Sequence, residues 1–175
     1  MIVWLNGPFG VGKSTTVARL HPSLEDATTY DPEVYGGLLQ RTLGIFQPGD
    51  FQNLPMWRTG TVRGAARRAR RHATVLMPMS VLNLDYQAEI LDGMRRRGLD
   101  VLHVTLHASS SELRRRIDAD TVDTGARPWR LEQLERYEKA YHGLAERGPV
   151  VDTDGRGPDE VAARVLDLVR ERRQP

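Results

Sequence analysis

The 175-residue sequence predicts a three-layer α/β fold, in which helices cover both faces of a five-stranded parallel sheet. Short apolar segments alternate with longer segments of helical periodicity five times along the chain. The first apolar segment, residues 2–6, leads directly into a glycine-rich turn that closes with Lys-Ser-Thr. A turn of this composition joins a buried strand to the N-terminus of a helix.

Each expected strand is an apolar run bounded by glycine, proline or polar residues. Strands are expected at residues 2–6, 27–33, 73–80, 100–109 and 149–153. Each expected helix has apolar residues at helical spacing, and proline, serine or glycine marks most helix ends. Helices are expected at residues 12–20, 32–42, 55–71, 84–98, 110–117, 129–147 and 157–173, with loops at 44–54 and 118–128. We expect one domain, residues 1–175, with a short lid at about residues 114–130.

The composition excludes several classes of protein. No apolar run approaches the ~18 residues that cross a bilayer, so stable membrane insertion is not expected. The net charge of +2 is too small to indicate nucleic-acid binding, and a chain without cysteine has neither disulfides nor thiolate metal sites. The five histidines lack the spacing of a zinc site. Because the N-terminus shows no signal peptide, we expect a cytoplasmic protein. We also expect either a monomer or a homodimer.

The glycine-rich turn at residues 7–14 matches G-x-x-x-x-G-K-[ST] and predicts a P-loop NTPase fold that binds ATP. Glycines let backbone N–H groups approach a phosphate, and the following helix adds its positive N-terminal end. Lys13 should reach the β- and γ-phosphates, and the Ser14 hydroxyl should ligate Mg²⁺. Lys139 is the only other lysine, which indicates a specific role for Lys13. The expected phosphate-binding residues are Gly7, Pro8, Phe9, Gly10, Val11, Gly12, Lys13, Ser14 and Thr15.

Asp31 is the candidate group opposite the phosphate, because it ends the second strand, which is expected to lie beside the first. Its carboxylate could orient or deprotonate an acceptor hydroxyl, or hold Mg²⁺ through water, with Glu33 assisting. The alternative is that Asp31 only caps the helix that begins at Pro32. The third strand ends without an acidic residue, and the next acid is Asp85, so metal anchoring depends on the loop serine, Asp31 or water.

Four further residues are candidates for binding the acceptor. Trp57 could stack on a ring and Arg58 could hold an anionic or sugar-like group, with core burial and a solvated helix face as the alternatives. Met79 suggests an apolar wall, with ordinary core packing as the alternative. Asn83 follows the third strand, at the sheet edge where parallel sheets bind ligands. The expected acceptor-binding residues are Asp31, Trp57, Arg58, Met79 and Asn83.

Arginines gather around the loop at residues 118–128 and predict a mobile lid. Such a lid over the γ-phosphate stabilises the charge of the transferred group and excludes water. The candidates are Arg114, Arg115, Arg116, Arg127 and Arg130, of which Arg116 and Arg127 are expected to act first. The expected catalytic residues are Lys13, Asp31, Arg116 and Arg127. Residues 150–155 form a turn whose backbone could contact adenine.

Five stretches resemble the bacterial tunicamycin resistance proteins, a family of small P-loop proteins of the nucleotide-kinase-like group. They are, in chain order, MIVWLNGPFGVGKST, YDPEVYG, DFQNLPMWR, VLMPMSVLNLDY and VTLHASSSELRRRI. The first stretch is common to P-loop proteins, whereas the next three are distinctive.

This resemblance implies a five-stranded parallel sheet of kinase-like order, ATP binding and resistance to a nucleoside antibiotic. By match to the family's motifs, residues 12–14 would bind phosphate, Asp31 would face the acceptor, and Arg116 would be the basic position before the lid. Asp120 departs from the family, which tends to be basic there, so the lid is expected to use Arg127 or Arg130. The family's longer basic, apolar tail is not seen after Pro175, which argues against membrane association.

The leading hypothesis is an ATP- and Mg²⁺-dependent phosphotransferase that moves the γ-phosphoryl group to a hydroxyl of a nucleoside antibiotic. A second hypothesis is a resistance protein that sequesters the drug when ATP is bound, without transfer. A third is a metabolic nucleoside or sugar kinase.

Overall fold

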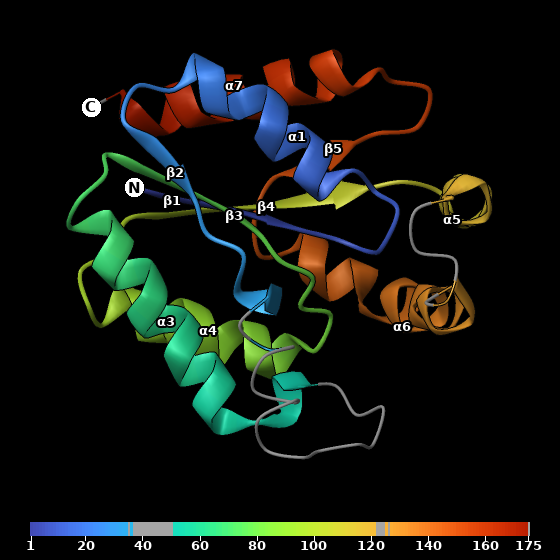
Figure 1. Cartoon of the computed structure of the whole chain (residues 1–175), viewed down its shortest axis with the longest axis horizontal. Helices are drawn as coiled ribbons and strands as arrows, with labels where there is room; N and C mark the ends of the chain where they lie inside the picture. Colours follow the sequence, from blue (N-terminus) through green and yellow to red (C-terminus); the bar gives the residue numbers. More distant parts are fainter. Residues whose placement is uncertain (35, 37–50, 122–124, 126, 175) are drawn as a thin grey trace.

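The strands form a single five-stranded parallel sheet with the order β2-β3-β1-β4-β5 (Figure 1). The computed structural model describes residues 1–34, 36, 51–121, 125 and 127–174. Its strands are β1 (Ile2–Asn6), β2 (Ala27–Thr29), β3 (Thr74–Pro78), β4 (Val101–His107) and β5 (Val150–Asp152). The parallel pairing and the kinase-like strand order, with β1 at the centre, confirm the predicted fold.

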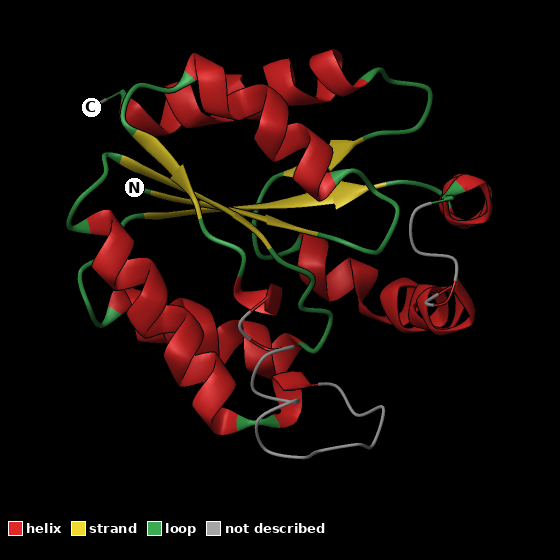
Figure 2. Ribbon diagram, viewed as in Figure 1, coloured by secondary structure: helices red, strands yellow, loops and turns green. Residues whose placement is uncertain are grey.

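Helices cover both faces of the sheet and complete the three predicted layers (Figure 2). Helices α1 (Lys13–Leu20) and α7 (Pro158–Arg173) pack against each other on one face. The other face is covered by α3 (Pro55–Ala69), α4 (Leu84–Arg95) and α6 (Arg127–Ala145). Helix α5 (Ser110–Ala119) lies beyond the carboxyl end of β4, and short 3₁₀ turns form at His21–Ser23 and Phe51–Asn53. Within the described ranges, no helix is long and apolar enough to cross a membrane.

Successive residues of β1 point into two separate apolar cores. Ile2 and Trp4 pack with residues of α3 and α4, whereas Val3 and Leu5 pack with residues of α1 and α7. All residues of β1 and of β3 are buried, as expected for central strands between two helical layers. These two strands therefore form a rigid base for the segments that follow their carboxyl ends.

The second strand differs from its prediction in length and in position. Strand β2 covers only Ala27–Thr29, and its partner is β3, so the expectation that Asp31 ends a strand beside β1 is wrong. The reason is that β1 and β3 pair directly with each other and leave no place for β2 between them. After Tyr30, whose N–H still bonds Leu76 O at 2.8 Å, the chain leaves the sheet and turns into a helical segment at Pro32.

Two predicted segments lie partly outside the described residues. The helix expected at residues 32–42 is described only through residue 34 and at residue 36, and of the loop at 44–54 only the part from Phe51 is described. Residues 122–124 and 126 of the expected lid are also outside the described ranges. Around them, α5 continues to Ala119 and α6 begins at Arg127, so Arg127 is helical and not part of a loop as predicted.

Hydrogen bonds link three polar residues, from β4, from α4 and from the chain after α6. His103 of β4 is 5% exposed, its Nε2 lies 3.0 Å from Gln87 Nε2, and its ring meets the Trp4 ring edge-on. Gln87 in turn accepts a hydrogen bond from Arg147 at 3.0 Å. Since the Gln87 amide nitrogen donates, His103 Nε2 accepts and the ring is neutral. Burial lowers the pKa of His103 to about 4.

We predict that this histidine makes the fold acid-sensitive. The unfolded chain, with a histidine pKa of about 6.5, binds a proton between pH 6.5 and pH 4 that the folded protein excludes. The free energy of unfolding should therefore fall as the pH is lowered through this window, by on the order of 3 kcal/mol in total. Urea titrations at a series of pH values measure this slope. His103→Gln should reduce it, whereas the control His21→Gln, at an exposed position, should keep it.

Candidate functional site

The glycine-rich loop begins at Asn6, a fully buried polar residue at the carboxyl end of β1. Asn6 Oδ1 accepts hydrogen bonds from Gly7 N at 2.9 Å and from Val81 N at 2.8 Å. Its Nδ2 donates to Val81 O at 2.9 Å. One side chain thus joins the start of the loop to the segment after β3. The sequence analysis assigned Asn6 no role. The position of this polar residue at the end of an apolar strand could have indicated that its side chain has a specific partner.

Two glycines allow the loop to adopt its path. Gly7 has a φ of +140°, and a Cβ there would lie 2.5 Å from Leu106 O, so the loop passes directly over the backbone of β4. Gly12 has a φ of +98° and turns the chain into α1. A side chain at either position would strain this backbone.

The N-terminus of α1 presents backbone donors. Among the described residues, none accepts a hydrogen bond from the amides of Gly12 through Thr15. Ser14 and Thr15 are exposed, whereas Thr16 is buried and its hydroxyl bonds Gly12 O at 2.9 Å. Amides with these geometries at a helix N-terminus form a binding site for an anion such as a phosphate group.

Lys13 lies over the same loop. Its Nζ donates to Gly7 O at 3.0 Å and to Pro8 O at 2.8 Å, and it lies 5.3 Å from the centre of the Phe9 ring. Desolvation lowers the pKa of Lys13 to about 8, against the opposing effect of the Glu33 and Asp31 carboxylates. Both acids therefore lie close enough to Lys13 to favour its charged form.

The two carboxylates are held by backbone amides. Asp31 Oδ1 accepts from Glu33 N at 2.8 Å, so Asp31 does cap the segment that begins at Pro32. Glu33 Oε1 accepts from Ser80 N at 2.6 Å, directly after β3. The chain therefore places a carboxylate from another segment at the end of the strand that has no acid of its own. The Ser80 hydroxyl is buried, and no described residue bonds it.

Two predicted acceptor-binding residues are internal supports of the segment behind Asp31. Trp57 is 0% exposed and its indole N–H donates to Pro32 O at 2.9 Å. Arg58 is 8% exposed, its Nε pairs with Glu89 at 2.6 Å, and its guanidinium lies 4.2 Å from the Tyr86 ring. The expectations that Trp57 stacks on an acceptor ring and that Arg58 grips the acceptor are contradicted by this burial.

The other two acceptor candidates have different surroundings. Met79 is 0% exposed and belongs to the core under α3 and α4, so the alternative of ordinary packing applies and the apolar wall is wrong. Asn83 is exposed and caps α4, where its side chain accepts from Asp85 N at 2.9 Å and from Tyr86 N at 3.1 Å. A role for Asn83 toward an acceptor stays a prediction.

The lid arginines separate into an outward and an inward group. Arg127 pairs with Asp118 at 2.8 Å, and its side chain is 52% exposed. Arg130 pairs with Asp120 at 2.6 Å, is 19% exposed, and lies close enough to Lys13 to lower its pKa. Beside it, the exposed Trp129 contacts Phe9 of the loop with ring centres 4.8 Å apart. Of these two arginines, Arg130 is therefore the one close to Lys13, whereas the sequence analysis expected Arg127 to act first.

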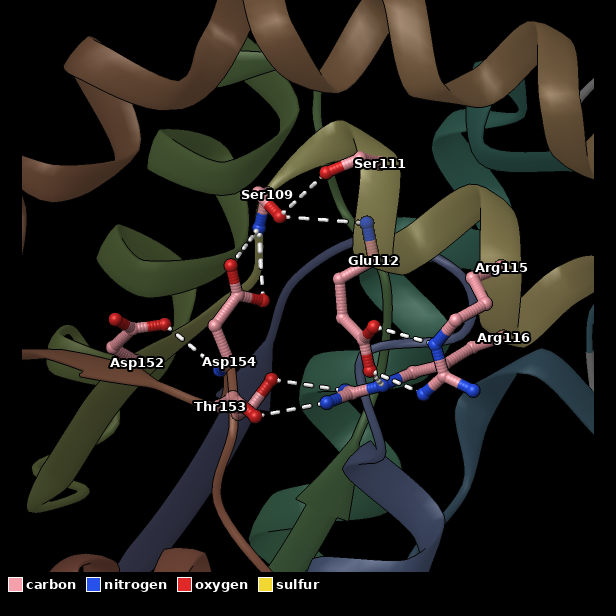
Figure 3. A network of polar contacts seen from close by, with 8 residues as sticks. All are labelled: Ser109, Ser111, Glu112, Arg115, Arg116, Asp152, Thr153 and Asp154. Atoms are coloured by element: carbon pink, nitrogen blue, oxygen red, sulfur yellow. Dashed lines mark hydrogen bonds and ion pairs between the residues drawn. The ribbon is translucent and has the colours of Figure 1, made fainter.

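A hollow of about 570 Å³ opens between the loop, α5 and the turn after β5, and neither of the two carboxylates lines it. Arg116 lines it and donates to Thr153 Oγ1 at 3.0 Å and Thr153 O at 2.8 Å (Figure 3). The hollow is lined by Gly10, Gly12, Thr15, Arg116, Thr153 and Pro158, among others. The turn expected to contact a base thus forms one wall of this hollow.

Comparison with known structures identifies the family. No protein-family model and no curated protein sequence matches this chain. The structure is similar to that of the tunicamycin resistance protein of Deinococcus radiodurans, with 30% sequence identity, a TM-score of 0.71, and coverage of 96% of this chain and 94% of that chain. This chain belongs to the tunicamycin resistance protein family. The match confirms the resemblance that the sequence motifs indicated.

This tunicamycin resistance family member also shares its fold with small-molecule kinases. A sugar kinase from Janibacter sp. is 16% identical, with a TM-score of 0.71 over 97% of this chain and 94% of that chain. The shikimate kinase of Acinetobacter baumannii, solved with shikimate, is 17% identical, with a TM-score of 0.63 over 99% and 95%. At these identities the likeness shows the kinase-like fold alone.

The lowered pKa of Lys13 predicts how phosphate binding depends on pH. A bound anion raises this pKa, so above pH 8 the complex takes up a proton that the free protein has lost. Affinity for Mg-ATP should then fall by up to ~10-fold per pH unit above pH 8. Calorimetry in buffers of different ionisation enthalpy measures both effects. Lys13→Met should abolish them, Lys139→Met at an exposed position should not, and a pH-independent wild-type affinity would contradict the assignment.

Proposed function

We propose that this protein transfers the γ-phosphoryl group of ATP to a hydroxyl of a nucleoside antibiotic. The observation that carries the proposal is one loop with unbonded amides and a lysine, close to two carboxylates that do not line the hollow. Amides and Lys13 suit a triphosphate, and a carboxylate suits an acceptor hydroxyl. Membership of the tunicamycin resistance family supports the class of acceptor.

In this proposal the nucleotide lies across the loop, with its base in the hollow beside Arg116. The phosphates follow the amides at the start of α1, and the γ-phosphate ends near Lys13. This orientation leaves the γ-phosphate between the loop and the acids Asp31 and Glu33. It also assigns Arg116 to the nucleotide base and not to the transferred group.

The residues present fit a magnesium ion that arrives with the nucleotide. Mg²⁺ retains several waters and uses few protein oxygens, and Ser14 offers an exposed hydroxyl at the loop. Glu33, fixed by Ser80 N, and the unbonded hydroxyl of Ser80 lie at the end of β3 and could hold waters of the ion. When bound, Mg²⁺ would neutralise charge on the phosphates.

The transfer step follows from these positions. The acceptor oxygen forms a bond to the γ-phosphorus, the bond from that phosphorus to ADP breaks, and the hydroxyl proton passes to Asp31. One oxygen of Asp31 accepts from Glu33 N, which orients the carboxylate. Lys13 and Arg130 stabilise the charge on the moving phosphoryl group.

ATP-dependent sequestration of the drug without transfer is the second candidate, favoured by the absence of an acid in β3 itself. A metabolic nucleoside or sugar kinase is the third, favoured by the fold shared with such enzymes. Mass spectrometry of tunicamycin incubated with protein and Mg-ATP separates the first two. A drug that stays unmodified but co-purifies with the protein supports sequestration. Turnover of a common nucleoside or sugar, with no reaction of tunicamycin, supports the third.

Asp31→Asn should abolish phosphoryl transfer and leave nucleotide binding intact. The amide still caps the segment at Pro32 but cannot accept the proton, so the rate should fall by ~10²–10⁴-fold. The affinity for Mg-ATP, measured by calorimetry, should change by less than about threefold, since Asp31 lies outside the phosphate-binding amides. Asp167→Asn, at a distant site on α7, is the matched control. Unchanged turnover in Asp31→Asn would show that Asp31 only caps the helical segment at Pro32 and takes no part in the reaction.

Arg130→Ala and Arg127→Ala form a second matched pair. Loss of the inward arginine should lower the transfer rate about 100-fold, because its charge faces the γ-phosphate site. Loss of the outward arginine should change the rate by less than about threefold, since its partner is the exposed Asp118. Steady-state kinetics of both variants test the assignment, which fails if Arg127→Ala is the slower enzyme.

A further inference from the structure

Arg116 is held in one plane by three hydrogen bonds. Its Nε donates to Glu112 Oε1 at 2.7 Å, while Nη1 and Nη2 donate to the hydroxyl and the carbonyl of Thr153 at 3.0 and 2.8 Å (Figure 3). The Glu112 partner lies one helical turn away on α5, and the Thr153 partners lie across the hollow's edge on the turn after β5. Bonds to both sides of a planar group fix its orientation.

Glu112 is itself held as a permanent carboxylate. Arg115 donates to both of its oxygens at 2.7 Å, and Arg116 donates to one. Hydrogen bonds from Arg115 and then Arg116 lower the pKa of Glu112 to about 2. The acid stays charged at any pH at which the protein would work, so it keeps its hold on Arg116.

The two chain segments of this wall are joined independently of Arg116. Both carboxylate oxygens of Asp154 accept from Ser109 N at 3.1 Å, and the Ser109 hydroxyl accepts from Glu112 N at 3.4 Å. The turn after β4 and the turn after β5 are thus connected at the start of α5 (Figure 3). The wall is therefore held together by contacts within the protein.

Arg116 uses three of its five N–H donors within the protein, because its Nε and both Nη atoms donate to Glu112 and Thr153. The Thr153 carbonyl accepts twice, from Arg116 at 2.8 Å and from Arg156 N at 3.4 Å. These bonds fix the plane of a guanidinium that lines the hollow.

We propose that Glu112 is the positioning residue of the base pocket. This inference rests on the proposed function, because it takes the hollow as the site of the nucleotide base. The face of a guanidinium stacks on a purine base. Glu112 acts through Arg116, since it sets the plane on which the base stacks.

Calorimetry with three Mg²⁺-bound probes tests this role. The probes are a non-hydrolysable ATP analogue, the matching GTP analogue and inorganic tripolyphosphate, which has no base. Glu112→Gln should weaken both nucleotides about tenfold and leave tripolyphosphate unchanged, because the loop amides remain intact. Arg116→Ala should do the same, and the double variant should lose no more than Arg116→Ala alone.

Glu146→Gln, at an exposed position on the chain after α6, controls for loss of one surface carboxylate, and melting temperatures confirm that each variant is folded. Equal weakening of tripolyphosphate in Glu112→Gln, or a further loss in the double variant, overturns the positioning role. If the wild type binds tripolyphosphate but no nucleotide, the inference fails, and if it binds none of the probes, the proposed function itself fails.

Discussion

The buried side chain of Asn6 is the contact on which the functional end of this molecule depends. A fully buried amide must have its hydrogen bonds satisfied, and all three of its bonds reach the first loop residue or the segment after β3. The carboxyl ends of β1 and β3 are therefore held in one register. Ser80 lies next to this contact and fixes Glu33, so the phosphate loop and the opposing carboxylate share one anchor.

Two different groups of residues lie around the loop. On one side, burial and Arg130 lower the pKa of Lys13, whereas Asp31 and Glu33 raise it. On the other side, Arg116 and Thr153 line the hollow and bond each other. A polyanion with an apolar, planar end matches this division, because the charged groups face one end and a flat guanidinium faces the other. The fold is shared with a sugar kinase and a shikimate kinase, so in the proposed reaction the choice of acceptor would depend on residues outside the shared loop.

Local pattern was sufficient for the loop, for the central strands and for most helix starts. Residues 7–14 form the predicted turn between strand and helix, because glycine conformation and the Lys-Ser-Thr sequence act over a few residues. Pro55 and Pro158 begin helices where expected, since proline favours the first helical turn. Motif resemblance also predicted the family and the strand order correctly.

By itself the sequence determined the alternation of strands and helices and the glycine-rich loop, since both depend on neighbouring residues. Only the tertiary structure decided that Trp57 and Arg58 are buried supports, that Arg130 and not Arg127 faces the loop, and that Glu33 reaches the end of β3. It also joined Glu112 to Thr153 through Arg116. These outcomes depend on contacts between residues tens of positions apart in the sequence. Packing against those distant residues sets the direction of each side chain, and the local sequence pattern does not determine it.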